Sequence, residues 1–190
     1  MTDGSGSLGS WSVRRIVTNM APLLLGLSVI VLWAGITLET ATALLETYPL
    51  LAVMIPAMIG MGGNLGSIMS SRLTTRLHLG TAAFDPLDPV LWANVAAVMA
   101  LAATIFTVLP TGAWLFGQVV GTSLGLVTLL FISLTSGLAI ATIAVVCSVA
   151  ATYGAYRLGV DPDDTTIPIV TNVVDVCGML VFVAIARVVL

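Results

Sequence analysis

Asp175 is the residue whose surroundings in the sequence most clearly suggest chemistry. It lies near the middle of Thr165–Leu190, a stretch that is otherwise apolar up to Arg187 and about long enough to cross a bilayer, whose core needs roughly 20 apolar residues. A carboxylate at that depth costs roughly 2.5–3.5 kcal/mol on insertion scales. Binding a cation or a proton on a transport path would offset this cost, so Asp175 predicts such a site.

The polar neighbours of Asp175 strengthen this prediction. Residues three or four apart share one face of a helix, so Thr171 and Asn172 lie on the same stripe as Asp175. The stripe continues through Pro168, Gly178 and Met179. The alternative is a buried carboxylate that is satisfied by Thr171 or Asn172 and only packs. Ionisable residues inside membranes are functional by default, so we favour the cation site.

A glycine-rich segment from Gly60 to Gly66 interrupts an earlier apolar stretch. We expect it to unwind locally and to expose carbonyl oxygens beside Gly62, Gly63 and Asn64, as broken backbone does where it lines a cavity. Plain helix packing by small residues is the alternative. The small and hydroxyl residues of this stretch form a stripe of Gly60, Gly63, Ser67, Ser70, Ser71 and Thr74.

Two acidic clusters flank these stretches. Asp161, Asp163 and Asp164 precede the last apolar stretch, where Asp163 or Asp164 can cap a helix and the three together could hold a hydrated divalent ion. Glu39 and Glu46 lie between the first two apolar stretches. They could concentrate cations by electrostatic steering, or they could simply be solvated.

Composition identifies the class of protein. Of the 190 residues, 58% are hydrophobic and 8% are charged, whereas soluble domains carry about 25% charged residues. We therefore expect an all-α integral membrane protein in a lipid bilayer. The acidic balance and the lack of lysine give no basic patch for nucleic acid. Cys147 and Cys177 fall in apolar runs and predict packing rather than a disulfide. No constellation typical of an enzyme occurs.

The apolar stretches predict five transmembrane helices in one domain. Residues 1–14 are expected to form a flexible polar leader, and residues 15–190 the membrane domain. Pro110 is expected to end the third helix, and Ala113–Thr122 to connect it to a long fourth helix. The predicted helices are Ile16–Leu38, Leu50–Leu73, Val90–Leu109, Ser123–Leu158 and Thr165–Leu190.

The arginines predict the orientation of these helices. With five spans, Arg187 lies on one side of the membrane and the other five arginines on the opposite side: Arg14, Arg15, Arg72, Arg76 and Arg157. Cytoplasmic loops carry the excess of arginine. The N-terminus is therefore expected in the cytoplasm and the C-terminus outside a cell membrane.

Two segments together resemble the MgtE-type magnesium channel family and its eukaryotic solute-carrier relatives. The first is Pro56–Gly66, which contains Gly-Gly-Asn at 62–64 and is followed by Ser-Arg-Leu-Thr-Thr at 71–75. The second is Gly159–Asp163, followed by Pro168 and, seven positions later, Asp175. The resemblance implies a homodimer that conducts Mg²⁺ through a pore on its two-fold axis. Helices two and five of both subunits line that pore, and Asp175 is the main cation site.

The sequence also departs from the family pattern. Val174 and Ile68 stand where bacterial members carry Asn and Gln, so their ion selectivity need not carry over. We expect no cytoplasmic magnesium-sensing domain, and a single five-helix unit where eukaryotic relatives have two.

The sequence therefore predicts a divalent cation transporter or channel for Mg²⁺, with Mn²⁺, Co²⁺ and Ca²⁺ as further candidates. A Na⁺- or H⁺-coupled exchanger and a non-transporting membrane subunit are the alternatives. The predicted metal-site residues are Asp175, Asn64, Thr171, Asn172, Gly62 and Gly63, followed by Asp161, Asp163 and Asp164.

Overall fold

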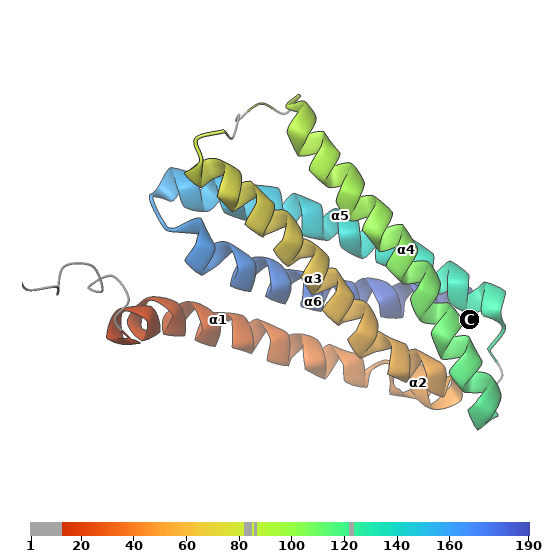
Figure 1. The fold of residues 1–190 in the computed structure, drawn as a ribbon. Helices are drawn as coiled ribbons and strands as arrows, with labels where there is room; N and C mark the ends of the chain where they lie inside the picture. Colours follow the sequence, from red (N-terminus) through yellow and green to blue (C-terminus); the bar gives the residue numbers. More distant parts are fainter. Residues whose placement is uncertain (1–12, 82–84, 86, 122–123) are drawn as a thin grey trace, which may run out of the picture.

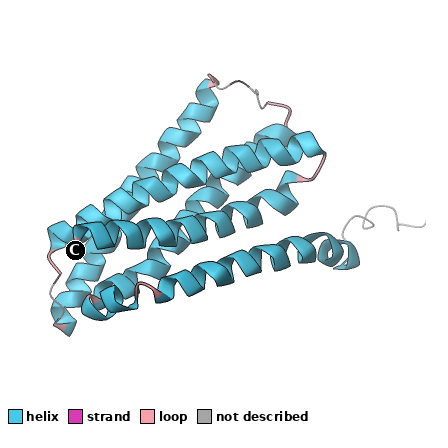
Figure 2. Ribbon diagram, turned by 180° about the vertical axis from the view of Figure 1, so that it is seen from behind, coloured by secondary structure: helices cyan, strands magenta, loops and turns pink. Residues whose placement is uncertain are grey.

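The fold is a bundle of long helices. The computed structural model describes residues 13–81, 85, 87–121 and 124–190, and the leader predicted for residues 1–14 lies almost entirely outside this part. Within it, all regular structure is helical (Figures 1 and 2). The helices are α1 (Val13–Glu39), α2 (Thr42–Thr47), α3 (Pro49–His78), α4 (Pro89–Val120), α5 (Leu126–Leu158) and α6 (Pro162–Val189).

Three helices, α3, α5 and α6, pack against one another and form the centre of the bundle. Helix α4 lies across α3 and α5, and α1 lies along α6 (Figure 1). Arg187 in the last turn of α6 donates a hydrogen bond to the carbonyl oxygen of Thr40 at 2.5 Å and so fixes the turn that joins α1 to α2. The central trio thus places α3 beside α6, the two helices that carry the predicted site.

Four helices are long and apolar enough to cross a membrane: α3, α4, α5 and residues 165–189 of α6. The apolar part of α1, Met20–Ile36, is shorter. Large apolar side chains are exposed on the outside of the bundle, among them Leu32, Trp33 and Val119. Such a surface suits lipid rather than water.

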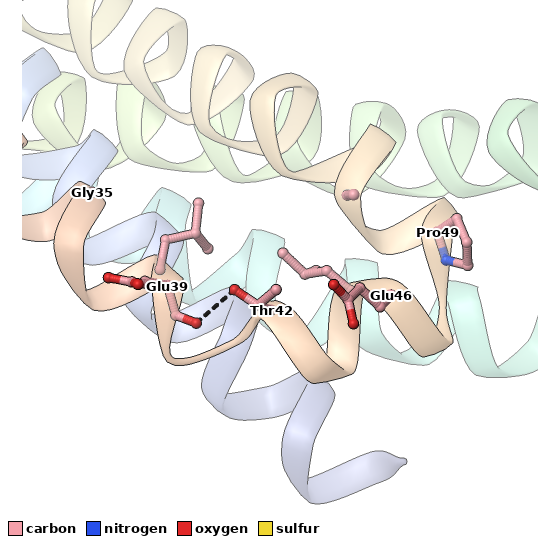
Figure 3. Close-up of a pocket in the computed structure, with 8 residues that line it drawn as sticks. Gly35, Glu39, Thr42, Glu46 and Pro49 are labelled. Atoms are coloured by element: carbon pink, nitrogen blue, oxygen red, sulfur yellow. Dashed lines mark hydrogen bonds between the residues drawn. The ribbon is translucent and has the colours of Figure 1, made fainter.

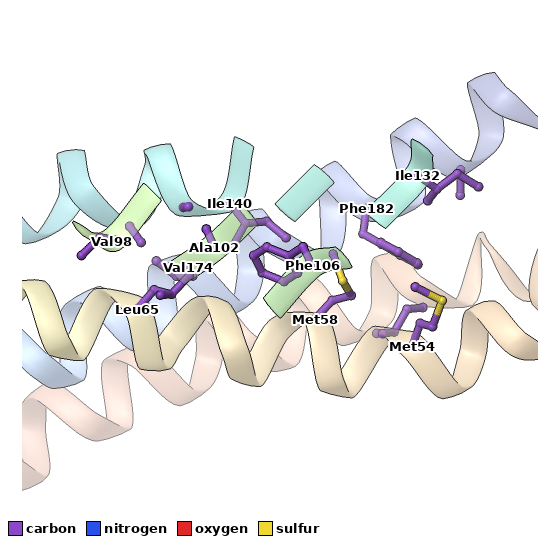
Figure 4. Close-up of a cluster of buried hydrophobic side chains, with 14 of the residues drawn as sticks. Met54, Met58, Leu65, Val98, Ala102, Phe106, Ile132, Ile140, Val174 and Phe182 are labelled. Carbon is purple, nitrogen blue, oxygen red and sulfur yellow. The ribbon is translucent and has the colours of Figure 1, made fainter. Parts of the chain in front are cut away.

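The buried core joins the central helices to α4 (Figure 4). Met54, Met58 and Leu65 of α3 contribute to it, as do Phe106 of α4 and Phe182 of α6, all at most 1% exposed. The core therefore runs along most of α3. Each predicted site residue on α3 lies either on the face that packs into this core or on the face that points away from it.

Pro110 does not end a helix, and the predicted connection Ala113–Thr122 is wrong because α4 continues to Val120. A proline inside a helix removes the hydrogen bond to the carbonyl four residues earlier, here that of Phe106. The Ser133 hydroxyl on α5 donates to the Phe106 carbonyl oxygen at 2.9 Å. A neighbouring helix thus replaces the lost bond, which a sequence reading of Pro110 alone does not reveal.

The predicted unwinding of the glycine-rich segment is also wrong, because α3 is continuous from Pro49 to His78. Its glycines let side chains of α5 and α6 approach the backbone, as shown by the contact of Gly66 with Val170. Ser148 of α5 donates to the Gly66 carbonyl oxygen at 3.0 Å without breaking the helix. The packing alternative is therefore confirmed.

Helix boundaries differ from the prediction at several other points. Helix α6 begins at Pro162 rather than Thr165, and α5 begins at Leu126 rather than Ser123. Proline is favoured in the first turn, where its missing N–H costs nothing. Helix α3 begins at Pro49, one residue before the predicted Leu50. The segment between Glu39 and Pro49, which connects the first two predicted helices, contains the short helix α2.

Candidate cation site

Asp175 of α6 lies directly against Gly63 of α3. Its Oδ1 is 3.2 Å from the point that a Cβ on Gly63 would occupy, and the Thr171 side chain is 3.8 Å from the same point. A larger residue at this position would push the carboxylate away by a few tenths of an ångström. Asp175 is half-buried, and no hydrogen bond or ion pair joins it to any residue in the described ranges. The structure thus presents, between two helices, a carboxylate that has no partner in the described part of the chain.

The polar neighbours of Asp175 do not satisfy it. The Thr171 hydroxyl donates to the carbonyl oxygens of Ile167 at 2.9 Å and Pro168 at 3.2 Å. The Asn172 side-chain N–H donates to the Pro168 carbonyl oxygen at 2.8 Å. Because both donors turn back to their own helix, the packing role considered for Asp175 has no support here. The oxygen atoms of Thr171 and Asn172 keep lone pairs that can accept from a hydrated ion.

The Gly-Gly-Asn residues face three different surroundings. Gly62 packs against Ile140 and Val174 inside the bundle, away from the carboxylate. Gly63 faces Asp175, as described. Asn64 is exposed and makes no hydrogen bond within the described part of the chain. Only Gly63 of these three therefore meets Asp175 within one chain.

An exposed and mainly non-hydrocarbon face continues along α3 beside this contact. Gly60, Asn64 and Ser71 lie on it, one turn or two apart, and nothing among the described residues lies within 4 Å of a Cβ built on Gly60. The apolar Ile68, which is 40% exposed, lies between Asn64 and Ser71. We call Gly60, Asn64 and Ser71 the open face of α3. Polar groups and bare backbone facing hydrocarbon are unfavourable, so the open face is suited to protein or water rather than to lipid.

A cavity of about 590 Å³ lies where α1, α2 and α3 meet (Figure 3). Glu39 and Glu46 line it, and Thr42 donates to the Glu39 carbonyl oxygen at 2.6 Å. Both glutamates are exposed. Exposure is compatible with either role considered for them, cation steering or plain solvation, and they lie at the end of the bundle opposite the last turns of α3 and α5 (Figure 1).

The acidic cluster before α6 is only partly described. Asp161 is exposed, and the side chains of Asp163 and Asp164 lie outside the described residues. Because α6 begins at Pro162, Asp163 and Asp164 belong to its first turn and not to its cap, which corrects the capping prediction. Negative charge in a first turn is still favourable. No group of three His, Cys, Asp or Glu side chains forms a metal cluster in the described part.

One ion pair lies at the same end of the bundle, between α3 and the start of α4. Arg76 and Asp88 approach to 2.7 Å, and Asp88 also accepts from the Val90 N–H at 3.0 Å. The hydrogen bond from Arg76, more than any other contact, lowers the pKa of Asp88 below its ordinary value. Asp88 thus contrasts with Asp175, which has no such partner among the described residues.

Sequence reasoning missed the polar residues of α5 that contact α3 and α4. Ser133 and Ser148 each donate to a backbone carbonyl of another helix. The signal was present as small residues at near-fourfold spacing: Ser133, Gly137, Ala141, Ala144, Ser148 and Thr152. Such spacing marks a face that approaches neighbouring helices closely.

One known protein family matches most of this chain. The family model MgtE, described as divalent cation transporter, matches residues 55–185, which is more than half of the chain. The matched range contains Gly63 on α3 and Asp175 on α6. No individual curated protein matches the chain.

Proposed function

We propose, from the premise that this chain belongs to the MgtE family of divalent cation transporters, that it moves Mg²⁺ past Asp175. Family membership and the apolar helices make it a multi-pass membrane protein that transports divalent cations. Transport rather than an enzymatic reaction is the function of that family. Mg²⁺ as the cargo and Asp175 as its site are the steps that we add.

The observation that carries the proposal is the position of the Asp175 carboxylate against Gly63, with no partner among the described residues. An unpaired charge inside a membrane segment is costly unless a counter-ion or water reaches it. Mg²⁺ dehydrates reluctantly and is usually held by one or two carboxylates plus its own waters. A half-buried carboxylate beside Thr171 and Asn172 suits a hydrated ion better than a dehydrated one.

A second copy of the chain would complete the site. The open face of α3 borders Asp175 and exposes polar groups at membrane depth. If two copies met along α3 and α6, the open faces would be covered and two Asp175 side chains would face each other. A divalent cation between them would neutralise both charges. Such a pairing would form a homodimer with the pore on its two-fold axis. We further propose that α1, whose apolar part Met20–Ile36 is shorter than the other spans, is the fifth span.

The charges at the two ends of the bundle support the orientation proposed for it. Arg76 and Arg157 lie at the end where α3 and α5 finish, and Glu39 and Glu46 lie at the other end. The arginine-rich end is expected in the cytoplasm. Mg²⁺ would then pass from the glutamates toward the arginine-rich end on entry.

Flux through reconstituted vesicles tests the role of Asp175. Asp175→Asn keeps the size of the side chain and removes its charge, and we expect Mg²⁺ flux to fall at least tenfold, about 1.4 kcal/mol in the barrier. Asp85→Asn, which removes a charge from an exposed loop residue, is the matched control and should retain flux. Unchanged flux in Asp175→Asn would reject the site.

The same vesicles separate the alternative functions. Flux that requires an opposing Na⁺ or H⁺ gradient would identify a coupled exchanger instead of a channel. No flux of Mg²⁺, Mn²⁺, Co²⁺ or Ca²⁺ from the intact protein would instead indicate a non-transporting subunit. We expect flux driven by the Mg²⁺ gradient alone.

Cross-linking in the membrane tests the homodimer. In a background of Cys147→Ala and Cys177→Ala, we expect Gly60→Cys to give cross-linked dimers with a short bifunctional thiol reagent. Gly26→Cys on α1 is the control, since a side chain at either glycine meets nothing within 4 Å. Equal cross-linking at the two positions would contradict an interface along the open face of α3.

A further inference from the structure

The contact between α3, α5 and α6 follows one register along the bundle. Gly62 lies against Ile140 and Val174, and Gly66, four residues later, lies against Ala144 and Val170. Because α6 runs opposite to α3 and α5 (Figure 1), a step of four forward on α3 and α5 matches a step of four backward on α6. These two levels of the register are apolar.

The next two levels consist mainly of hydroxyl residues. Continuing the register places Ser70 beside Ser148 and Thr166, and then Thr74 beside Thr152 and Pro162. Ser70, Ser148, Thr152 and Thr166 are all 0% exposed, and Thr74 is 2% exposed. We call these five residues the hydroxyl cluster. It lies closer than Asp175 to the arginine-rich end of the bundle, where α3 and α5 finish.

Most hydroxyls of the cluster lack a hydrogen-bond partner in the part of the chain that the structure describes. Ser148 donates to the Gly66 carbonyl oxygen at 3.0 Å. The hydroxyl oxygens of Ser70, Thr152 and Thr166 are fully buried and have no hydrogen-bond partner among the described residues. Buried polar groups in native proteins are nearly always paired, by protein or by ordered water. Three such groups on three helices in adjacent levels therefore point to a shared ligand.

We propose that the hydroxyl cluster binds ordered water, which hydrogen-bonds α3, α5 and α6 to one another. A water molecule donates two hydrogen bonds and accepts two, so it can pair with hydroxyls in either sense. A bound cation fits less well, because the buried polar side chains at these levels are neutral hydroxyls and the carboxylate of Asp161, beside Pro162, belongs to an exposed residue. The proposal does not depend on Asp175 or on the transported ion.

The sign of a stability change tests the proposal. If water bridges the hydroxyls, Ser70→Ala, Thr152→Val and Thr166→Val each leave the water and the remaining hydroxyls short of a partner. We expect each variant to lower the apparent melting temperature in detergent by roughly 2–4 °C. If the hydroxyls were instead dry, removing any of them would raise the melting temperature, and that result would overturn the proposal.

Combining the substitutions gives a second criterion. The triple variant replaces all three unpaired hydroxyls by apolar groups and so removes the partners that hold the water, and its loss should be smaller than the sum of the single losses. Strictly additive losses would contradict a shared ligand. Thr142→Val is the matched control because its hydroxyl donates within its own helix to Leu138 and is exposed; it should change the melting temperature little.

Radiolytic footprinting detects the water directly, even if a variant folds poorly. X-ray pulses convert bound water into hydroxyl radicals that oxidise adjacent side chains. We expect oxidation of Met69, which is 0% exposed and precedes Ser70, but not of Met54, which is 1% exposed in the apolar core. Loss of Met69 oxidation in the triple variant would support the site. Equal oxidation of Met69 and Met54 in the unmodified protein would refute it.

Discussion

Two helix contacts in this protein both involve a glycine, but one is closed and apolar and the other is polar and partly open. Where α4 crosses α5, the Phe106 ring occupies the place of a side chain on Gly137, and Phe106 is 0% exposed. Where α3 meets α6, the Asp175 carboxylate lies 3.2 Å from the corresponding place on Gly63, and Asp175 is half-buried. The first contact is closed and apolar, whereas the second is polar and borders the open face of α3.

This difference shows how one packing device serves stability and function separately. In lipid, helices associate through close packing rather than the hydrophobic effect, so the interlocked Phe106–Gly137 contact can hold the bundle. The Asp175–Gly63 contact is less tightly packed and places a charged group, rather than an apolar side chain, between the helices. Mutations at the first contact should therefore lower the stability of the fold, and mutations at the second should lower transport.

The largest expected effect on stability is that of Phe106→Ala. It empties a fully buried site, and such changes cost about 3–5 kcal/mol. Thermal unfolding in detergent, followed by tryptophan fluorescence, measures the loss. Phe131→Ala on α5 is the control because Phe131 is 57% exposed and should change stability little. Equal losses in the two variants would contradict the stabilising role that we assign to the closed Phe106–Gly137 contact.

A smaller loss is expected for Gly137→Ala. The added methyl group would lie well inside van der Waals contact of the Phe106 ring, and overpacking of this kind costs about 1–3 kcal/mol. The same unfolding assay applies. Gly112→Ala places a methyl group on α4 with nothing within 4 Å and is expected to be neutral or slightly stabilising. A destabilised Gly112→Ala would show that any alanine disturbs these helices.

Gly63→Ala is expected to affect transport more than stability. Its methyl group would lie 3.2 Å from the Asp175 Oδ1, so the carboxylate has to move by a few tenths of an ångström. We expect Mg²⁺ flux to fall about threefold to tenfold, roughly 0.7–1.4 kcal/mol in the barrier, with an unchanged melting temperature. Gly60→Ala is the control, because its methyl group meets no described atom of the same chain within 4 Å. A drop in melting temperature for Gly63→Ala but not for Gly60→Ala would show that Gly63, like Gly137, serves the packing of the bundle.

The smallest effect concerns Asp88, the paired counterpart of Asp175. Because Arg76 lowers the pKa of Asp88, the pair stabilises the fold above the unfolded pKa of about 3.9. This contribution is lost as the pH falls through the lower folded pKa. Asp88→Asn retains a side-chain oxygen that can cap α4 but loses the ion pair with Arg76. We expect it to melt slightly below the unmodified protein at pH 7 and to approach it below about pH 4. A gap that is constant with pH would contradict the ion pair.

Much of the fold could be predicted because the length of an apolar stretch, which predicts a membrane-spanning helix, is read from consecutive residues alone. The family, the all-α class and the helical stretches around Asp175 follow from the sequence, and the family match over residues 55–185 confirms the resemblance. Pro110 was misinterpreted because its lost hydrogen bond is replaced by Ser133, which lies 27 residues from the Phe106 carbonyl that it binds. The glycine-rich segment was misinterpreted because glycine permits unwinding and close packing equally well.

The sequence by itself determined that this chain spans a membrane and carries one carboxylate deep within a span, because both follow from residue types along a single helix. Only the tertiary structure decided which glycine faces Asp175, why Thr171 and Asn172 leave it unpaired, and where the buried hydroxyls meet. These outcomes depend on the register between α3, α5 and α6. That register is set by the volumes of side chains that come from different helices and lie far apart in the sequence. It therefore cannot be read from any one helix.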